Sequence, residues 1–142
     1  MSTNSRIVLS RPDAHRLRAI LGARRGSLRD RVHLEELYEE VERARILEEE
    51  HVPADIVTMG AEVRVRDSET GVASQYVVVA PAQADLAAGH ISVLAPLGTA
   101  LLGYREGDEV EWHMPGGVRR LTIEKVKQPE RNAPERAEEV AS

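Results

Sequence analysis

The spacing of the apolar residues changes near Pro53, and this change constrains the fold more than any other feature of the chain. Before Pro53, apolar residues recur every three or four positions, as they do on one face of an α-helix. From Ala61 onward they alternate with polar residues, as they do in a strand with one buried face. We therefore expect an α+β protein, with a helical part in residues 1–52 and a β-rich domain in residues 53–128.

Two helices are predicted in the helical part. Ser10 and Pro12 provide a helix cap and a proline in the first turn, and Gly22 lies where the first helix should end. The apolar face of this helix consists of Ala14, Leu17, Ile20 and Leu21. The second helix should run from about residue 28 to residue 50. Its heptad-like seam consists of Leu34, Leu37, Val41 and Ala44.

The two predicted helices carry opposite charge. Residues 11–31 contain seven Arg and two Asp, whereas residues 35–50 contain eight Glu and two Arg. An amphipathic helix cannot bury its apolar face alone, so we expect an antiparallel helical hairpin, a short coiled coil. Each exposed ion pair contributes only about 0.2–1 kcal/mol. The charges therefore determine which helix faces pair more than they stabilise the hairpin. The alternative is that both helices pack separately on a globule.

The β-rich domain should contain several short strands and one helix. The strands are predicted around residues 63–66, 76–79, 91–93, 110–112 and 121–123. Turns are expected at residues 67–71 and 114–117, and a short buried helix at residues 96–102, because Pro96 begins it and Gly103 follows it. Residues 129–142 are charged, contain two prolines and lack an apolar face, so we expect a disordered tail.

The composition argues against several classes of function. The chain has no cysteine, which excludes a thiol nucleophile, a disulfide and cysteine-ligated zinc. Its net charge of −5 argues against direct, specific binding of nucleic acid. No apolar run approaches the roughly 20 residues that span a bilayer, so we expect a cytoplasmic protein without membrane contact. The five histidines are scattered, and no phosphate-binding loop or nucleophile elbow is present. We therefore expect no enzyme, no cofactor and no metal.

The aromatic content limits the kind of pocket that the chain should form. The chain has no Phe, one Trp and three Tyr. Aromatic side chains supply much of the lining of ligand pockets. We therefore expect that any pocket in this protein lacks an aromatic lining.

A series of motifs in the β-rich domain resembles a known family. The motifs are residues 53–59, 91–103, 106–108, 112–117 and 128–130. They resemble the C-terminal domain of the Gre transcript-cleavage factors and, more closely, the Rnk family, called regulators of nucleoside diphosphate kinase. The resemblance covers about residues 6–130. The stretch from Ser92 to Gly103 and the Pro-Gly-Gly turn at residues 115–117 are its most specific parts.

The resemblance implies both a fold and a partner. The implied fold is FKBP-like, a twisted antiparallel sheet wrapped around the short helix. In Gre-type factors this domain docks at the rim of the secondary channel of RNA polymerase, and the helical hairpin enters the channel. The residues that correspond to the docking loop are Ser92, Val93, Leu94, Pro96, Leu97 and Gly98.

The hairpin tip departs from the Gre pattern. Cleavage by Gre factors needs two carboxylates at the tip, which hold a magnesium ion. The corresponding residues are Arg24, Arg25, Ser27, Arg29 and Asp30. Ser27 stands at the first acid and Asp30 near the second, so a single carboxylate lies among arginines. We therefore expect a monomeric, non-catalytic factor that binds RNA polymerase and competes with Gre-type factors without promoting cleavage.

Three other functions remain open at this point. The first is an active Gre-like cleavage factor, because Asp30 is retained. The second is a peptidyl-prolyl isomerase, because of the FKBP-like fold, although a fold alone does not give a function. The third is a direct regulator of nucleoside diphosphate kinase, as the family name suggests.

Overall fold

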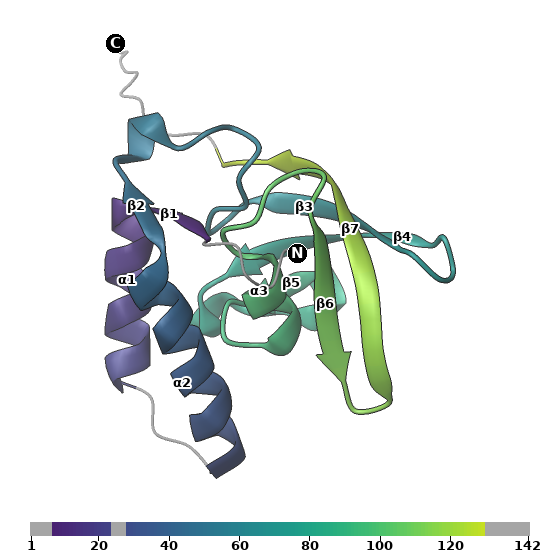
Figure 1. Cartoon of the computed structure of the whole chain (residues 1–142), viewed down its shortest axis with the longest axis horizontal. Coiled ribbons are helices and arrows are strands. Elements are labelled where there is room, and N and C mark those ends of the chain that lie inside the picture. Colours follow the sequence, from purple (N-terminus) through teal and green to yellow (C-terminus); the bar gives the residue numbers. More distant parts are fainter. Residues whose placement is uncertain (1–6, 24–27, 130–142) are drawn as a thin grey trace.

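The computed structural model describes residues 7–23 and 28–129. Helices α1 (Arg11–Ala23) and α2 (Leu28–Arg43) lie side by side and run in opposite directions (Figure 1). Their facing sides bury the apolar residues that the spacing predicted, including Leu17, Leu37 and Val41. The basic first helix and the acidic second helix are joined by an exposed ion pair at 3.5 Å between Arg18 and Glu42.

Helix α2 ends at Arg43, so the prediction that it continues to about residue 50 is wrong. Strand β2 (Arg45–Leu47) follows and pairs in parallel with β1 (Val8–Ser10), and the short 3-10 helix η2 (Glu49–His51) comes next. The N–H of Arg45 donates to the carbonyl of Ile7 at 2.9 Å instead of to its own helix. A partner strand thus takes over the backbone hydrogen bonds, and helical spacing along one segment does not reveal such a partner.

The β-rich domain forms a five-stranded sheet in the order β5-β4-β3-β7-β6. Its strands are β3 (Glu62–Asp67), β4 (Ala73–Val79), β5 (His90–Ser92), β6 (Glu109–Met114) and β7 (Gly117–Lys127). Neighbouring strands are antiparallel except β4 and β5, which are parallel and are connected through η3 (Pro81–Gln83) and η4 (Leu86–Ala88). Helix α3 (Pro96–Leu101) follows β5 and packs against β6. The sheet curls strongly beside the two long helices (Figure 1).

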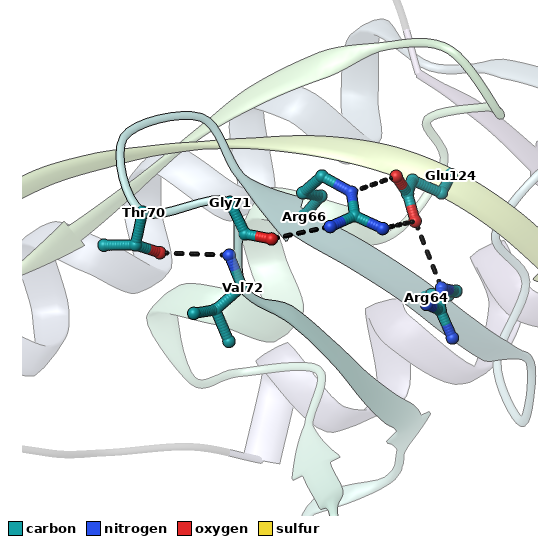
Figure 2. A network of polar contacts seen from close by, with 6 residues as sticks. All are labelled: Arg64, Arg66, Thr70, Gly71, Val72 and Glu124. Atoms are coloured by element: carbon teal, nitrogen blue, oxygen red, sulfur yellow. Dashed lines mark hydrogen bonds and ion pairs between the residues drawn. The ribbon is translucent and has the colours of Figure 1, made fainter.

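A β-bulge in β7 shifts the alternation of buried and exposed residues. The pairing of β3 with β7 changes register between Arg64 and Val65, so Glu124 is the extra residue on β7. Glu124 accepts hydrogen bonds from both Arg64 and Arg66 on the outer face of the sheet, and Figure 2 shows its carboxylate between the two guanidinium groups. The hydrogen bond from Arg66 is the main reason why the pKa of Glu124 is lowered. This network ties β3 to β7 across the bulge.

One hydrophobic core joins the helical part to the β-rich domain. The cluster contains Leu17 and Val41 from the helices and Ile123 from the sheet. The N–H of Val8 donates to the carbonyl of Gly103 at 3.0 Å, and a Cβ at Gly103 would lie only 2.5 Å from the Cβ of Ile7. The two parts therefore meet over a tightly packed junction. The division at residues 52 and 53 stays a prediction.

Two further expectations concern segments at the limits of the structure. The predicted disordered tail lies outside the described residues except for Pro129. In the part of the chain that the structure describes, no helix is long and apolar enough to cross a membrane.

Candidate functional site

The loop that joins β5 to α3 is held by hydrogen bonds of its own residues. The Oγ atom of Ser92 accepts from the N–H of Leu94 at 3.0 Å, and the Ser92 carbonyl accepts from the N–H of Ala95 at 3.0 Å. The hydroxyl of Thr99 donates to the carbonyl of Val93 at 2.9 Å. The serine, which the sequence marked as part of the docking motif, thus builds the turn that leads into α3.

Gly98 allows α3 to approach the end of β5. A Cβ at this position would collide with the carbonyl oxygen of Ser92 and would lie 3.1 Å from the Cα of Val93. No side chain fits there without movement of the backbone. The glycine in the motif is therefore explained by close packing of the helix on the strand.

The structure separates the predicted docking residues by exposure. Those that are buried are Val93, Leu94, Leu97 and Gly98. Ser92 is half-buried, and Pro96 is exposed. Among them, Pro96 is the residue most accessible to a partner, whereas the buried ones shape the loop beneath it. The docking role itself stays a prediction.

A cleft of about 310 Å³ lies next to Pro96, between α2, α3 and β6. We call it the α2–β6 cleft. Its lining consists of Glu36, Leu37, Glu40, Pro96, Thr99, Ala100, Tyr104, Val110, Glu111 and His113. The glutamates come from α2 and β6, whereas Leu37, Ala100 and Val110 form apolar walls. Burial raises the pKa of the Tyr104 phenol, and the nearby charges of Glu40 and Asp108 raise it further.

A second cavity, of about 320 Å³, lies over the inner face of the sheet. Its lining includes Tyr76 and Trp112, so the expectation that any pocket would lack aromatic residues is wrong. The fold gathers two of the few aromatic side chains from β4 and β6, which are far apart in sequence. Arg119 also lines this cavity and donates a hydrogen bond to Asp67 at 2.7 Å. That bond is the main reason why the pKa of Asp67 is lowered.

The hairpin tip is largely outside the described residues. Arg24, Arg25 and Ser27 lie between the two described segments. Arg29 and Asp30 belong to the first turn of α2. In residues 7–23 and 28–129, no group of three or more His, Asp or Glu residues could hold a metal ion. The roles assigned to the tip stay predictions.

Sequence reasoning missed a contact that positions the helices on the β-rich domain. Ser10 caps α1, because its Oγ atom accepts from the N–H of Asp13 at 3.1 Å. The buried carboxylate of Asp13 then accepts from the N–H of Met59 at 3.0 Å. An acid three residues after a serine cap commonly bonds back to the cap itself, whereas the carboxylate of Asp13 reaches a residue in the β-rich domain.

Comparison with known proteins identifies the family to which this chain belongs. Residues 52–128 match the family described as "Transcription elongation factor, GreA/GreB, C-term". The regulator of nucleoside diphosphate kinase of Escherichia coli K12 is 40% identical over 79 residues, which are 56% of this chain and 58% of that protein. The chain thus spans little more than half the length of this relative.

A second relative and a solved structure cover more of the chain. The transcription elongation factor GreA of Chloroflexus aurantiacus is 36% identical over 115 residues, which are 81% of this chain and 68% of that protein. The structure of a GreA/GreB elongation factor from Nitrosomonas europaea superimposes with a TM-score of 0.73 at 35% identity, covering 87% of this chain and 99% of that one. The chain therefore belongs to the GreA/GreB family of transcription elongation factors and is related to the regulators of nucleoside diphosphate kinase, as its motifs predicted.

Proposed function

We propose that this protein is a non-catalytic transcription accessory factor that binds RNA polymerase near the secondary channel and competes there with Gre-type factors. The observation that carries the proposal is the family match over residues 52–128, which contains the whole sheet, the β5–α3 loop and α3. Pro96 is exposed at the end of that loop, where α3 begins, and borders the α2–β6 cleft. A polymerase surface would therefore have an accessible contact point where the β5–α3 loop meets α3.

The hairpin supports the second half of the proposal, the lack of cleavage. Asp30 is the one carboxylate in the tip segment from Arg24 to Asp30, and a divalent cation needs several oxygen ligands. Helix α1 has 13 residues, which at 1.5 Å per residue span only about 20 Å. The single carboxylate and the short first helix thus support a factor that does not promote cleavage. The protein would act as a cytoplasmic monomer and would need no cofactor.

A competition assay tests the proposal directly. Excess protein should suppress Gre-stimulated transcript cleavage on a stalled elongation complex, because both factors would occupy the same rim of the channel. The full chain is the appropriate reagent, since its helices share a core with the β-rich domain. Simultaneous and independent binding of both factors to the polymerase would contradict the proposal.

An active cleavage factor is the first alternative, and the tip offers a direct test of it. The Ser27→Asp variant adds a second carboxylate to the segment from Arg24 to Asp30. If reach is limiting, this variant should still fail to stimulate cleavage by the polymerase. Cleavage stimulated by the wild-type protein would favour the alternative, whereas cleavage recovered only in Ser27→Asp would show that charge was the missing element.

A peptidyl-prolyl isomerase is favoured by one observation, the cavity that Tyr76 and Trp112 line. The appropriate measurement is the rate of cis–trans isomerisation of a short X-Pro peptide, with the Trp112→Ala variant as the control. We expect no acceleration by either protein. Acceleration that Trp112→Ala abolishes would assign this activity to the cavity.

Direct regulation of nucleoside diphosphate kinase is the remaining alternative, and it rests on the name of the E. coli relative. Binding of purified kinase to the immobilised chain tests it without assumptions about mechanism. We expect no binding at concentrations that saturate RNA polymerase.

A further inference from the structure

The cavity over the inner face of the sheet, which we call the aromatic cavity, has the size and the walls of a small-ligand site. Its volume is about 320 Å³, and pockets that bind small molecules begin at about 300 Å³. The buried side chains of Val65 and Leu121 contribute apolar surface to it, and Tyr76 and Trp112 line it as half-buried aromatic residues. A cavity of this size and lining suits a ligand with a single ring system.

The charged groups of the aromatic cavity compensate each other. The lining contains one acid and one base, and the NH1 group of Arg119 donates to the Oδ2 atom of Asp67 at 2.7 Å. The Oδ1 atom of Asp67 accepts from the N–H groups of Glu69 at 2.8 Å and Thr70 at 3.2 Å. Outside the lining, Glu69 and Arg120 are exposed and of opposite sign. A charged ligand would enter this space without a free counterion, so the cavity favours an uncharged one.

The polar groups that stay available in the aromatic cavity are mainly donors. Only the NH1 group of Arg119 bonds to Asp67, and its other N–H groups have no partner among the described residues. The indole N–H of Trp112 and the hydroxyls of Ser74 and Tyr76 likewise make no hydrogen bond within residues 7–23 and 28–129. A donor that a ligand covers costs free energy unless the ligand accepts a hydrogen bond from it. The ligand should therefore carry an acceptor.

We propose that the aromatic cavity is a binding site for a small, uncharged ligand that combines a flat ring with a carbonyl acceptor. The ring would pack against Tyr76 and Trp112, and the carbonyl would accept a hydrogen bond from Arg119. Because Asp67 already holds the guanidinium group in place, little conformational freedom is lost when the ligand binds. Binding of this kind involves no catalysis, which distinguishes it from isomerase activity.

This site is separate from the surface that we assign to polymerase binding. No residue of its lining belongs to the β5–α3 loop, to the α2–β6 cleft or to the hairpin tip. The inference therefore stands whether or not the protein binds polymerase.

Three probes with the same ring test the preference for an uncharged ligand. Benzamide is neutral near pH 7, benzoate is anionic and benzylamine is cationic. The chain has one Trp, so the indole N–H resonance of Trp112 reports binding to the full-length protein by NMR. Benzamide should shift this resonance with saturation in the millimolar range, and both charged probes should bind about fivefold more weakly. Equal affinity for the three probes, or no saturable shift with benzamide, would overturn the inference.

A pair of tyrosine variants tests the location of the site. Tyr76→Leu removes one aromatic wall and keeps Trp112 as the reporter, so it should weaken benzamide binding about fivefold. The matched control is Tyr38→Leu, the same change at an exposed position of α2 outside the lining, and it should bind benzamide as the wild type does. Equal affinity in both variants would mean that the ring does not bind between the aromatic residues.

A second pair uses exposed valines, whose replacement leaves the core intact. Val72 lines the aromatic cavity and Val118 does not, and both are at least half exposed. Val72→Glu adds a carboxylate to the cavity, so it should lower the affinity for benzamide and raise that for benzylamine. Val118→Glu should change neither affinity. The same response in both variants would contradict binding in this cavity.

Discussion

The carboxylate of Asp13 accepts a hydrogen bond at 3.0 Å from the backbone N–H of Met59, a residue 46 positions further along the chain. Asp13 lies in the first turn of α1, and Met59 precedes the first strand of the large sheet. The bond therefore fixes the start of the hairpin to the base of the β-rich domain. Because Asp13 is only 7% exposed, its ionisation is coupled to the stability of this junction.

We expect Asp13→Asn to change the pH dependence of stability. Burial raises the pKa of Asp13 above its ordinary value, and the bond from Met59 opposes this only in part. The folded protein thus binds the proton more tightly than the unfolded chain does, and the contribution of Asp13 is lost as pH rises through its folded pKa. The free energy of unfolding of Asp13→Asn, relative to the wild type, should increase over the pH range above about 4. Urea denaturation across this range measures it.

Two controls separate the ionisation of Asp13 from its hydrogen bond. Asp13→Ala removes the acceptor and leaves the N–H of Met59 buried, so it should cost about 1–3 kcal/mol. Glu35→Gln removes an exposed carboxylate on α2 and should leave the pH profile unchanged. A pH profile of Asp13→Asn parallel to that of the wild type would contradict the assignment.

Asp67 should show the opposite pH dependence. The hydrogen bond from Arg119 lowers the pKa of Asp67, and the N–H groups of Glu69 and Thr70 lower it further. The contribution of this carboxylate is present above its unfolded pKa and is lost as pH falls through the folded pKa. The Asp67→Asn variant should therefore lose less stability than the wild type on acidification below about pH 4. Arg119→Gln should raise the pKa of Asp67, which carboxyl NMR can follow.

Gly98→Ala should damage the β5–α3 loop. The new Cβ would collide with the carbonyl of Ser92, and overpacking of this kind costs about 1–3 kcal/mol. Gly22→Ala is the matched control, because a Cβ in this exposed part of α1 meets nothing within 4 Å. That control should gain up to about 1 kcal/mol from helix propensity. Thermal denaturation compares the two, and a neutral Gly98→Ala would show that the helix can move away from the strand.

Replacement of Arg24 and Arg25 by Ser should weaken competition with Gre-type factors but leave the melting temperature nearly unchanged. Arginines that crowd a short tip repel one another unless an anionic partner is near, and a polymerase channel offers acidic side chains and nucleotide phosphates. Attraction of this kind mainly accelerates association and weakens with salt. Cleavage-inhibition titrations at two salt concentrations measure the effect. Unchanged competition would mean that the tip makes no contact in the channel.

The elements with strong local signals could be predicted from the sequence. Val63 and Val65 alternate with arginines and form a strand with one buried face, and Pro96 begins α3 as expected. The end of α2 could not be predicted, because Arg45 leaves the helix to bond with Ile7, which is 38 positions away in the chain. The bulge at Glu124 could not be predicted from the sequence either, because it depends on the register between β3 and β7.

Some features of the candidate site could likewise be predicted from the sequence, and others could not. The sequence by itself determined the family, because its motifs depend on residue identity and short spacing. The docking and tip roles that we assigned from the same motifs stay predictions. Only the tertiary structure decided which motif residues are accessible, since burial of Leu94 and Leu97 depends on packing around α3. It also decided that Tyr76 and Trp112 share a cavity and that glutamates of α2 and β6 converge on one cleft. Such groupings arise from contacts between segments that are distant in sequence, and local sequence patterns do not reveal those contacts.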